Sequence, residues 1–71
     1  MLDYEYLGDM LESTLARAHY QDGASKRALR SILSDYLACY GETREDRANL
    51  KRIALDGLKY NYPDAYQRVT S

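Results

Sequence analysis

Residues 29–41 read LRSILSDYLACYG and carry the clearest structural pattern in the chain. Large apolar side chains recur there at the three- and four-residue spacing of one helix face, at Leu29, Ile32, Leu33, Tyr36, Leu37 and Tyr40. Ser25 stands before this stretch as a candidate N-cap, and Gly41 can end the helix. The pattern predicts an amphipathic helix over about residues 25–40.

The segment before Gly23 shows the same periodicity. Its apolar side chains recur every three or four residues, at Tyr4, Leu7, Met10, Leu11, Leu15 and Ala18. Asp3 precedes them as a candidate N-cap, and Gly23 can adopt the left-handed conformation in which many helices stop. Gly8 weakens the first two turns unless a neighbouring backbone packs against it. We therefore predict a helix over about residues 4–21.

A third helix is predicted after Gly41. Thr43 and Asp46 have the spacing of a capping box. The apolar residues behind them share one helix face and are Leu50, Ile53, Ala54 and Leu58. This predicts a helix over about residues 44–60. Pro63 suits the first turn of a further helix, and Tyr66 and Val69 could share its face, which predicts a short helix over residues 63–69.

The fold class follows from these helices and from the absence of strand patterns in the sequence. β-Branched residues are few and never alternate with polar ones over a usable run. The connections are short, which favours antiparallel neighbours. We predict an all-α fold, with residues 1–71 forming one domain built as a small antiparallel three-helix bundle. So small a core gives little net stability, which favours additional burial against a partner or a second copy of the chain.

Composition excludes several classes of protein. The 71 residues hold ten Lys and Arg, eleven Asp and Glu, one His and one Cys. The single Cys39 excludes an internal disulfide, and no apolar run approaches the roughly 18–20 residues of a membrane span. Asp3 and Glu5 stand where a signal peptide would be basic. We expect a cytoplasmic protein without a membrane segment, with Cys39 as a small buried apolar residue.

Catalysis is not predicted. His19 has no partner residues at metal-ligand or nucleophile spacing, and the sequence has no C-x-x-C pair and no glycine-rich loop that follows a strand. A bundle of this size offers no cleft in which paired carboxylates could be desolvated. We expect no enzymatic activity, no cofactor, no metal and no small-molecule substrate.

Three cations stand where the helix dipole disfavours them. Lys26 and Arg27 lie in the first turn of the predicted second helix, and Arg30 lies one turn further on. Together with the free N–H groups of that helix start, they could hold a phosphate or the carboxylates of a partner. We treat these three residues as candidate partner-binding residues.

The aromatic residues of this chain are all tyrosines. There are eight Tyr and no Phe or Trp, and Tyr is enriched at protein interfaces because it offers apolar contact together with a hydrogen bond. Tyr36 and Tyr40 lie on the apolar face of the second helix and are expected at the core or its boundary. Tyr60, Tyr62 and Tyr66 are the better interface candidates because the tail has little else to bury them, and the bundle would place them near Lys26.

The near-neutral total charge conceals an uneven distribution. Residues 1–22 have a net charge of −4 and residues 23–71 a net charge of +3. Glu5, Asp9 and Glu12 form one acidic stripe on the first helix, at spacings of four and three residues. This stripe is a candidate second docking face for a basic surface, on a partner or on a second copy in a dimer.

A basic stripe on the third helix suggests an alternative. Arg44, Arg47 and Lys51 share one face, and the pattern around Gly41 and Thr43 resembles a helix-turn-helix over about twenty residues. Glu42 and Arg47 depart from that pattern at positions that are normally apolar.

The sequence therefore predicts a non-enzymatic protein-binding module. It would act as an adaptor, regulator or inhibitor by occluding or bridging a partner surface, as small accessory proteins of phages and mobile elements do. The alternative is a helix-turn-helix-like transcriptional regulator that binds nucleic acid.

Overall fold

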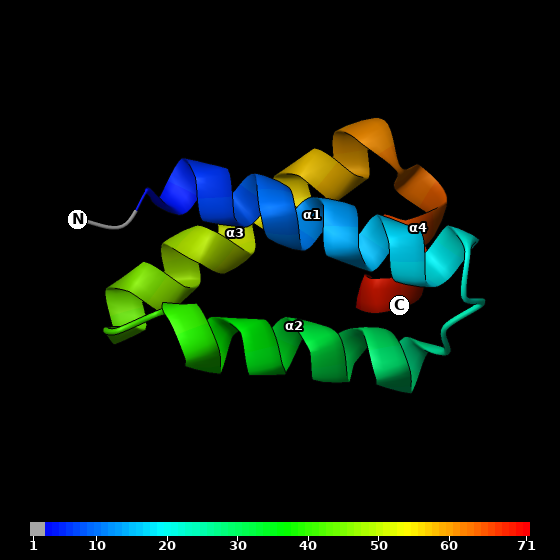
Figure 1. The fold of residues 1–71 in the computed structure, drawn as a ribbon. Helices are drawn as coiled ribbons and strands as arrows, with labels where there is room; N and C mark the ends of the chain where they lie inside the picture. The colour runs from blue at the N-terminus through cyan, green and yellow to red at the C-terminus, as the bar shows by residue number, and fades with distance from the viewer. Residues whose placement is uncertain (1–2) are drawn as a thin grey trace.

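Four helices make up the described part of the chain. The computed structural model describes residues 3–71, with α1 at Tyr4–Tyr20, α2 at Lys26–Tyr40, α3 at Arg44–Asn61 and α4 at Pro63–Thr70. Figure 1 shows α1 and α2 running antiparallel, α3 crossing α1, and α4 at the end where α1 stops and α2 starts. The predicted all-α class and antiparallel bundle are confirmed, and so is the short last helix.

The helix starts are fixed by the capping residues that the sequence offers. The Asp3 carboxylate accepts hydrogen bonds from the first turn of α1, and the Ser25 hydroxyl accepts one from Ala28 N–H at 3.1 Å. Thr43 and Asp46 form a complete capping box at the start of α3. The turn after α1 passes through Gly23 with a φ of +61°, a left-handed conformation that suits glycine. Each helix begins and ends within one residue of its predicted bounds.

The core is made mainly of leucines contributed by the first three helices. Its fully buried large side chains are Leu11, Leu15, Leu29, Leu50 and Leu58. Helices α1 and α3 form the most extensive contact in the bundle, and α2 packs less extensively against either of them. The bundle is therefore a tight α1–α3 pair with α2 and α4 laid against it.

Two glycines allow the close approach of α1 and α3. A Cβ atom at Gly8 would lie 2.8 Å from Cβ of Ile53, which is too close for any real contact. On the other helix, Gly57 leaves room for the Glu12 side chain, whose Oε2 accepts a hydrogen bond of 3.0 Å from Asn61 Nδ2. We call this contact, between Gly8 and Glu12 on α1 and Ile53, Gly57 and Asn61 on α3, the α1–α3 seam.

Helix α4 is tied to segments far away in the sequence. Ala65 and Val69 bury its inner face, and Pro63 occupies its first turn. Arg30 Nε donates a hydrogen bond of 3.1 Å to the Val69 carbonyl, and Arg68 reaches the carbonyl of Ala24 at 3.3 Å. These contacts join α4 to the start of α2.

Two predictions about burial are wrong. Met10 was expected on the buried stripe of the first helix, yet its side chain is 44% exposed. Cys39 was expected to be buried and is exposed. Both residues lie beside the core-facing line of their helix, because α1 packs chiefly on α3 and α2 buries little beyond Leu29 and Leu33.

Candidate functional site

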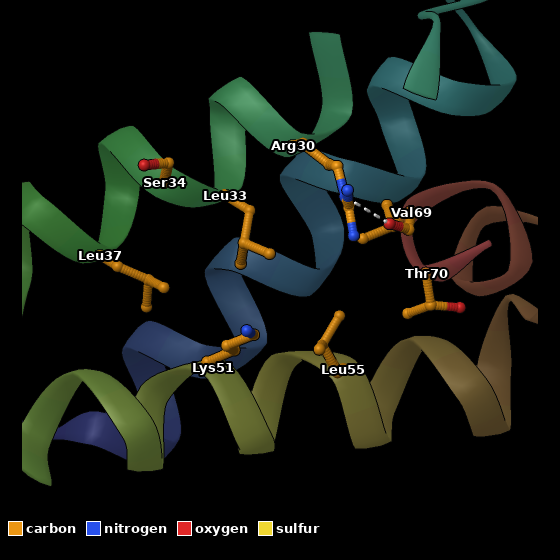
Figure 2. A pocket seen from close by; sticks show the side chains of 8 residues that line it. All are labelled: Arg30, Leu33, Ser34, Leu37, Lys51, Leu55, Val69 and Thr70. Carbon is orange, nitrogen blue, oxygen red and sulfur yellow. Dashed lines mark hydrogen bonds between the residues drawn. The ribbon is translucent and has the colours of Figure 1, made fainter. Parts of the chain in front are cut away.

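An open groove lies between α2, α3 and the end of α4. It has a volume of about 490 Å³ and is lined by Arg30, Leu33, Ser34, Leu37, Lys51, Leu55, Val69 and Thr70. Figure 2 shows Leu33 and Leu37 of α2 pointing toward α3 and Leu55 pointing back toward α2, with Arg30 directed at Val69 at one end. We refer to this feature as the groove.

The groove follows from helical spacing. On α2 its lining residues, Arg30, Leu33, Ser34 and Leu37, fall on one edge of the helix at spacings of three, one and three residues. They extend over about 11 Å of the helix axis. On α3, Lys51 and Leu55 lie one turn apart. The groove therefore has the length of about two helical turns.

Apolar carbon dominates the interior of the groove, and cations stand at its edges. Leu33 and Val69 are buried, whereas Leu37 and Leu55 are half-buried and present part of their side chains to the opening. Arg30 and Lys51 are exposed, and none of the lining residues is acidic. The groove therefore combines an apolar surface with positive charge.

The charges of the groove are not neutralised within the molecule. Across residues 3–71 there is one ion pair within 4.0 Å, between the exposed side chains of Arg52 and Asp56 on α3. Arg30 uses Nε for the bond to Val69, and the remaining N–H groups of its guanidinium have no hydrogen-bond partner among residues 3–71. Lys51 has no carboxylate within 4.0 Å in the described part of the chain, so both cations are available to an acidic group.

The structure does not bring the predicted partner-binding cations of α2 together at one site. Arg30 lines the groove, whereas Lys26 borders a shallow depression that also includes His19 and Arg68. Arg27 is exposed and lines neither of these features. The three cations do not converge on one point.

The predicted tyrosines do not form one surface, and none of them lines the depression that Lys26 borders. Tyr62 packs against Tyr20 with ring centroids 6.0 Å apart, and Tyr66 is half-buried against the core. Lys59 Nζ lies 5.9 Å from the centre of the Tyr66 ring. Tyr60 is 89% exposed. Of the three, Tyr60 is thus the one whose ring stands almost entirely free.

One member of the acidic stripe of α1 makes a side-chain hydrogen bond within the described part of the fold, and the other two do not. Glu12 is bound by Asn61 across the α1–α3 seam, whereas Glu5 and Asp9 are exposed. The structure thus leaves two members of this stripe open to another molecule.

The basic stripe of α3 is also divided. Arg47 turns back on the preceding loop, where its guanidinium donates hydrogen bonds to the carbonyls of Gly41 and Glu42 at 3.0 and 3.4 Å. Lys51 lines the groove, and Arg44 is exposed. Arg47, the central member of the stripe, therefore has a structural contact that competes with binding to phosphates.

Two tyrosines have a raised pKa. Burial raises the pKa of Tyr36, with a further contribution from Tyr40, whose ring centroid lies 4.6 Å away, and from Tyr6 and Cys39. Desolvation, followed by hydrogen bonding to Asp46 and the negative charge of that carboxylate, raises the pKa of Tyr4. Neither tyrosine lines the groove.

Sequence reasoning missed the apolar residues of the groove. Leu55 lies off the predicted apolar face of α3, and an apolar residue outside such a face is a signal of a second contact surface. Leu37 belongs to the predicted α2 stripe but is only half-buried, because α3 does not close over it. The spacing of apolar residues along a helix does not determine how wide the gap to a neighbouring helix is.

Further findings concern the whole of residues 3–71. None of the helices in this range is long and apolar enough to cross a membrane. Within the same range there is no group of three or more His, Cys, Asp or Glu side chains that could hold a metal ion. The chain has no match among protein-family models, curated proteins or solved structures.

Proposed function

We propose that this protein is a non-catalytic protein-binding module, and that its groove receives an acidic amphipathic helix of a partner protein. The supporting observation is the combination of an open apolar groove with two unneutralised cations, Arg30 and Lys51. By occluding that helix, or by bridging its protein to another molecule, the module would act as an adaptor, regulator or inhibitor.

Dimensions and charge favour a helix as the occupant. The lining residues of α2 span about 11 Å, which matches roughly two turns of a docked helix with apolar side chains at spacings of three and four residues. The apolar side of such a helix would cover Leu33, Leu37 and Leu55. Its acidic side chains would face Arg30 and Lys51, a complementarity that favours association and fixes orientation.

The nucleic-acid alternative has less support. Arg47 is engaged with the loop carbonyls, and Glu45 and Asp46 occupy the first turn of α3, where they would repel phosphates. Lys51 belongs to both proposals, so the experiment must separate them.

The test uses a labelled model peptide, a sixteen-residue amphipathic helix with leucines on one side and glutamates on the other. A second peptide replaces every glutamate with lysine. Fluorescence anisotropy measures binding of both, and NMR chemical shifts locate the site. We expect binding of the acidic peptide, with shifts confined to the groove.

Two neighbouring residues provide a matched pair of variants. Lys51→Glu reverses a charge in the groove, and Arg52→Glu makes the same change on the solvent-exposed side of α3, outside the groove. We expect the first to weaken acidic-peptide binding about tenfold and the second to leave it nearly unchanged. Equal effects of the two variants, or a preference for the basic peptide, would contradict the proposal. Salt-sensitive binding of a DNA duplex that is lost in Arg44→Glu would favour the nucleic-acid alternative.

A further inference from the structure

Helix α1 carries a second exposed surface, on the side that faces away from the core. Tyr6, Met10, Ser13 and Arg17 follow one another along it at spacings of four, three and four residues. Tyr6 is 60% and Met10 44% exposed, and Ser13 and Arg17 are exposed as well. We call these four residues the α1 outer stripe.

A hollow lies at one end of this stripe. It has a volume of about 300 Å³ and is lined by Ser13, Ala16, Arg17, Tyr20, Gln21 and Tyr62. At the other end lies the exposed side chain of Tyr6. The two features lie eleven residues apart when measured from Tyr6 to Arg17, which is about 16 Å along the helix axis.

The spacing of the stripe is symmetric about its midpoint. If two copies of α1 pack antiparallel about that midpoint, Tyr6 of each copy lies opposite Arg17 of the other, and Met10 lies opposite Ser13. Each tyrosine then meets the partner's hollow, and each guanidinium meets an aromatic ring, a favourable cation–π arrangement. The same surface patch serves both copies, as a two-fold interface requires.

The charges of α1 favour the same arrangement. Asp9 lies one turn from Tyr6 on the outer side of the acidic half of the helix, whereas Arg17 and His19 lie in its last turn. Antiparallel packing brings the exposed Asp9 of each copy toward Arg17 of the other, and it also aligns the helix dipoles in opposite directions. Arg17 has no carboxylate within 4.0 Å among residues 3–71, so it is free to form this contact.

We infer that the protein forms a two-fold symmetric homodimer through the α1 outer stripe, with Tyr6 of each copy seated in the hollow beside Arg17 of the other. This interface lies on α1 and leaves the groove between α2 and α3 open. It does not depend on the proposed function, and a dimer would present two grooves.

The first test is the oligomeric state of the full chain by sedimentation equilibrium over a range of protein concentrations. We expect a monomer–dimer equilibrium whose dissociation constant rises at least tenfold in Tyr6→Ala and in Arg17→Glu. Tyr60→Ala and Arg52→Glu are the controls, since they change an exposed tyrosine and an exposed arginine elsewhere, and they should leave the dissociation constant unchanged. Circular dichroism checks that every variant keeps its helices.

The second test locates the two-fold axis. The midpoint of the stripe lies between Met10 and Ser13, so the two copies of position 13 are about 4.5 Å apart along the axis. In a Cys39→Ser background, Ser13→Cys should form a disulfide-linked dimer under mild oxidation, whereas Ser31→Cys on the exposed side of α2 should not.

A protein that stays monomeric at every concentration, or equal crosslinking at positions 13 and 31, would overturn the inference. A dimer that is lost in Lys51→Glu and retained in Arg17→Glu would also overturn it, because the groove would then be the site of self-association.

Discussion

The two edges of α3 that face other helices differ in how closely the neighbouring helix approaches. On one edge, Gly57 and Ile53 form the α1–α3 seam, in which the helices approach so closely that a single added methyl group at Gly8 has no space. On the other edge, Lys51 and Leu55 face α2 across the groove. The comparison shows that side-chain size at a few positions, rather than overall apolarity, decides whether two helices close on each other or leave a binding surface.

The largest expected difference between the two edges comes from leucine truncation. Leu58 is fully buried and Leu55 is half-buried one turn away on the same helix. We expect Leu58→Ala to lower the free energy of unfolding by about 2–5 kcal/mol and Leu55→Ala by about 1 kcal/mol, because less contact is lost at an open site. Urea unfolding followed by circular dichroism measures both. Equal losses would mean that the groove is closed in solution.

Glycine replacement probes the seam with a smaller effect. At Gly8 an added methyl group meets the branched side chain of Ile53, so we expect Gly8→Ala to cost about 1–3 kcal/mol in spite of the better helix propensity of alanine. At Gly57 the methyl group meets the flexible end of Glu12, which can move away. Gly57→Ala should therefore change stability by less than about 1 kcal/mol. The same unfolding measurement applies, and a reversed order of the two variants would contradict this account of the seam.

The smallest expected effect is a loss of stability at alkaline pH, caused by Tyr4 at the start of α1. Desolvation and the neighbouring Asp46 hold the pKa of Tyr4 above its ordinary value of about 10. Below that value Tyr4 is neutral in both the folded and the unfolded chain. Above it the unfolded chain loses its proton first, so stability falls as the pH rises through the folded pKa.

Replacement of the tyrosine hydroxyl tests this linkage. Tyr4→Phe should flatten the fall in stability above about pH 10, whereas Tyr60→Phe, at a nearly fully exposed position, should leave its slope as in the unaltered protein. Thermal unfolding at a series of pH values gives the slopes. Identical slopes in all three proteins would show that Tyr4 has an ordinary pKa.

Periodicity and capping residues predicted the helices closely. Asp3, Ser25 and the pair Thr43 and Asp46 all act as caps, because a cap depends on residues two or three positions away along the chain. Gly8 was expected to weaken the start of α1 unless a neighbouring backbone packs against it, and the group that packs there is the Ile53 side chain.

The candidate sites were less accessible to sequence reasoning. The basic stripe of α3 was expected to act as a unit, but Arg47 binds the carbonyls of Gly41 and Glu42 while Lys51 lines the groove. Whether an arginine folds back on a loop or extends into a groove depends on tertiary geometry. The groove itself requires the separation of α2 from α3, which no local pattern contains.

The hydrogen bonds that hold α4 have a consequence for the order of folding. Arg30 and Val69 are 39 residues apart in the chain, and Ala24 and Arg68 are 44 apart. Contacts that close such long loops carry a larger entropic cost than the turns that join α1 to α2 and α2 to α3. We therefore expect α4 to dock after α2 and α3 have paired through their short turn, so that the end wall of the groove, formed by Val69 and Thr70, is completed after its sides.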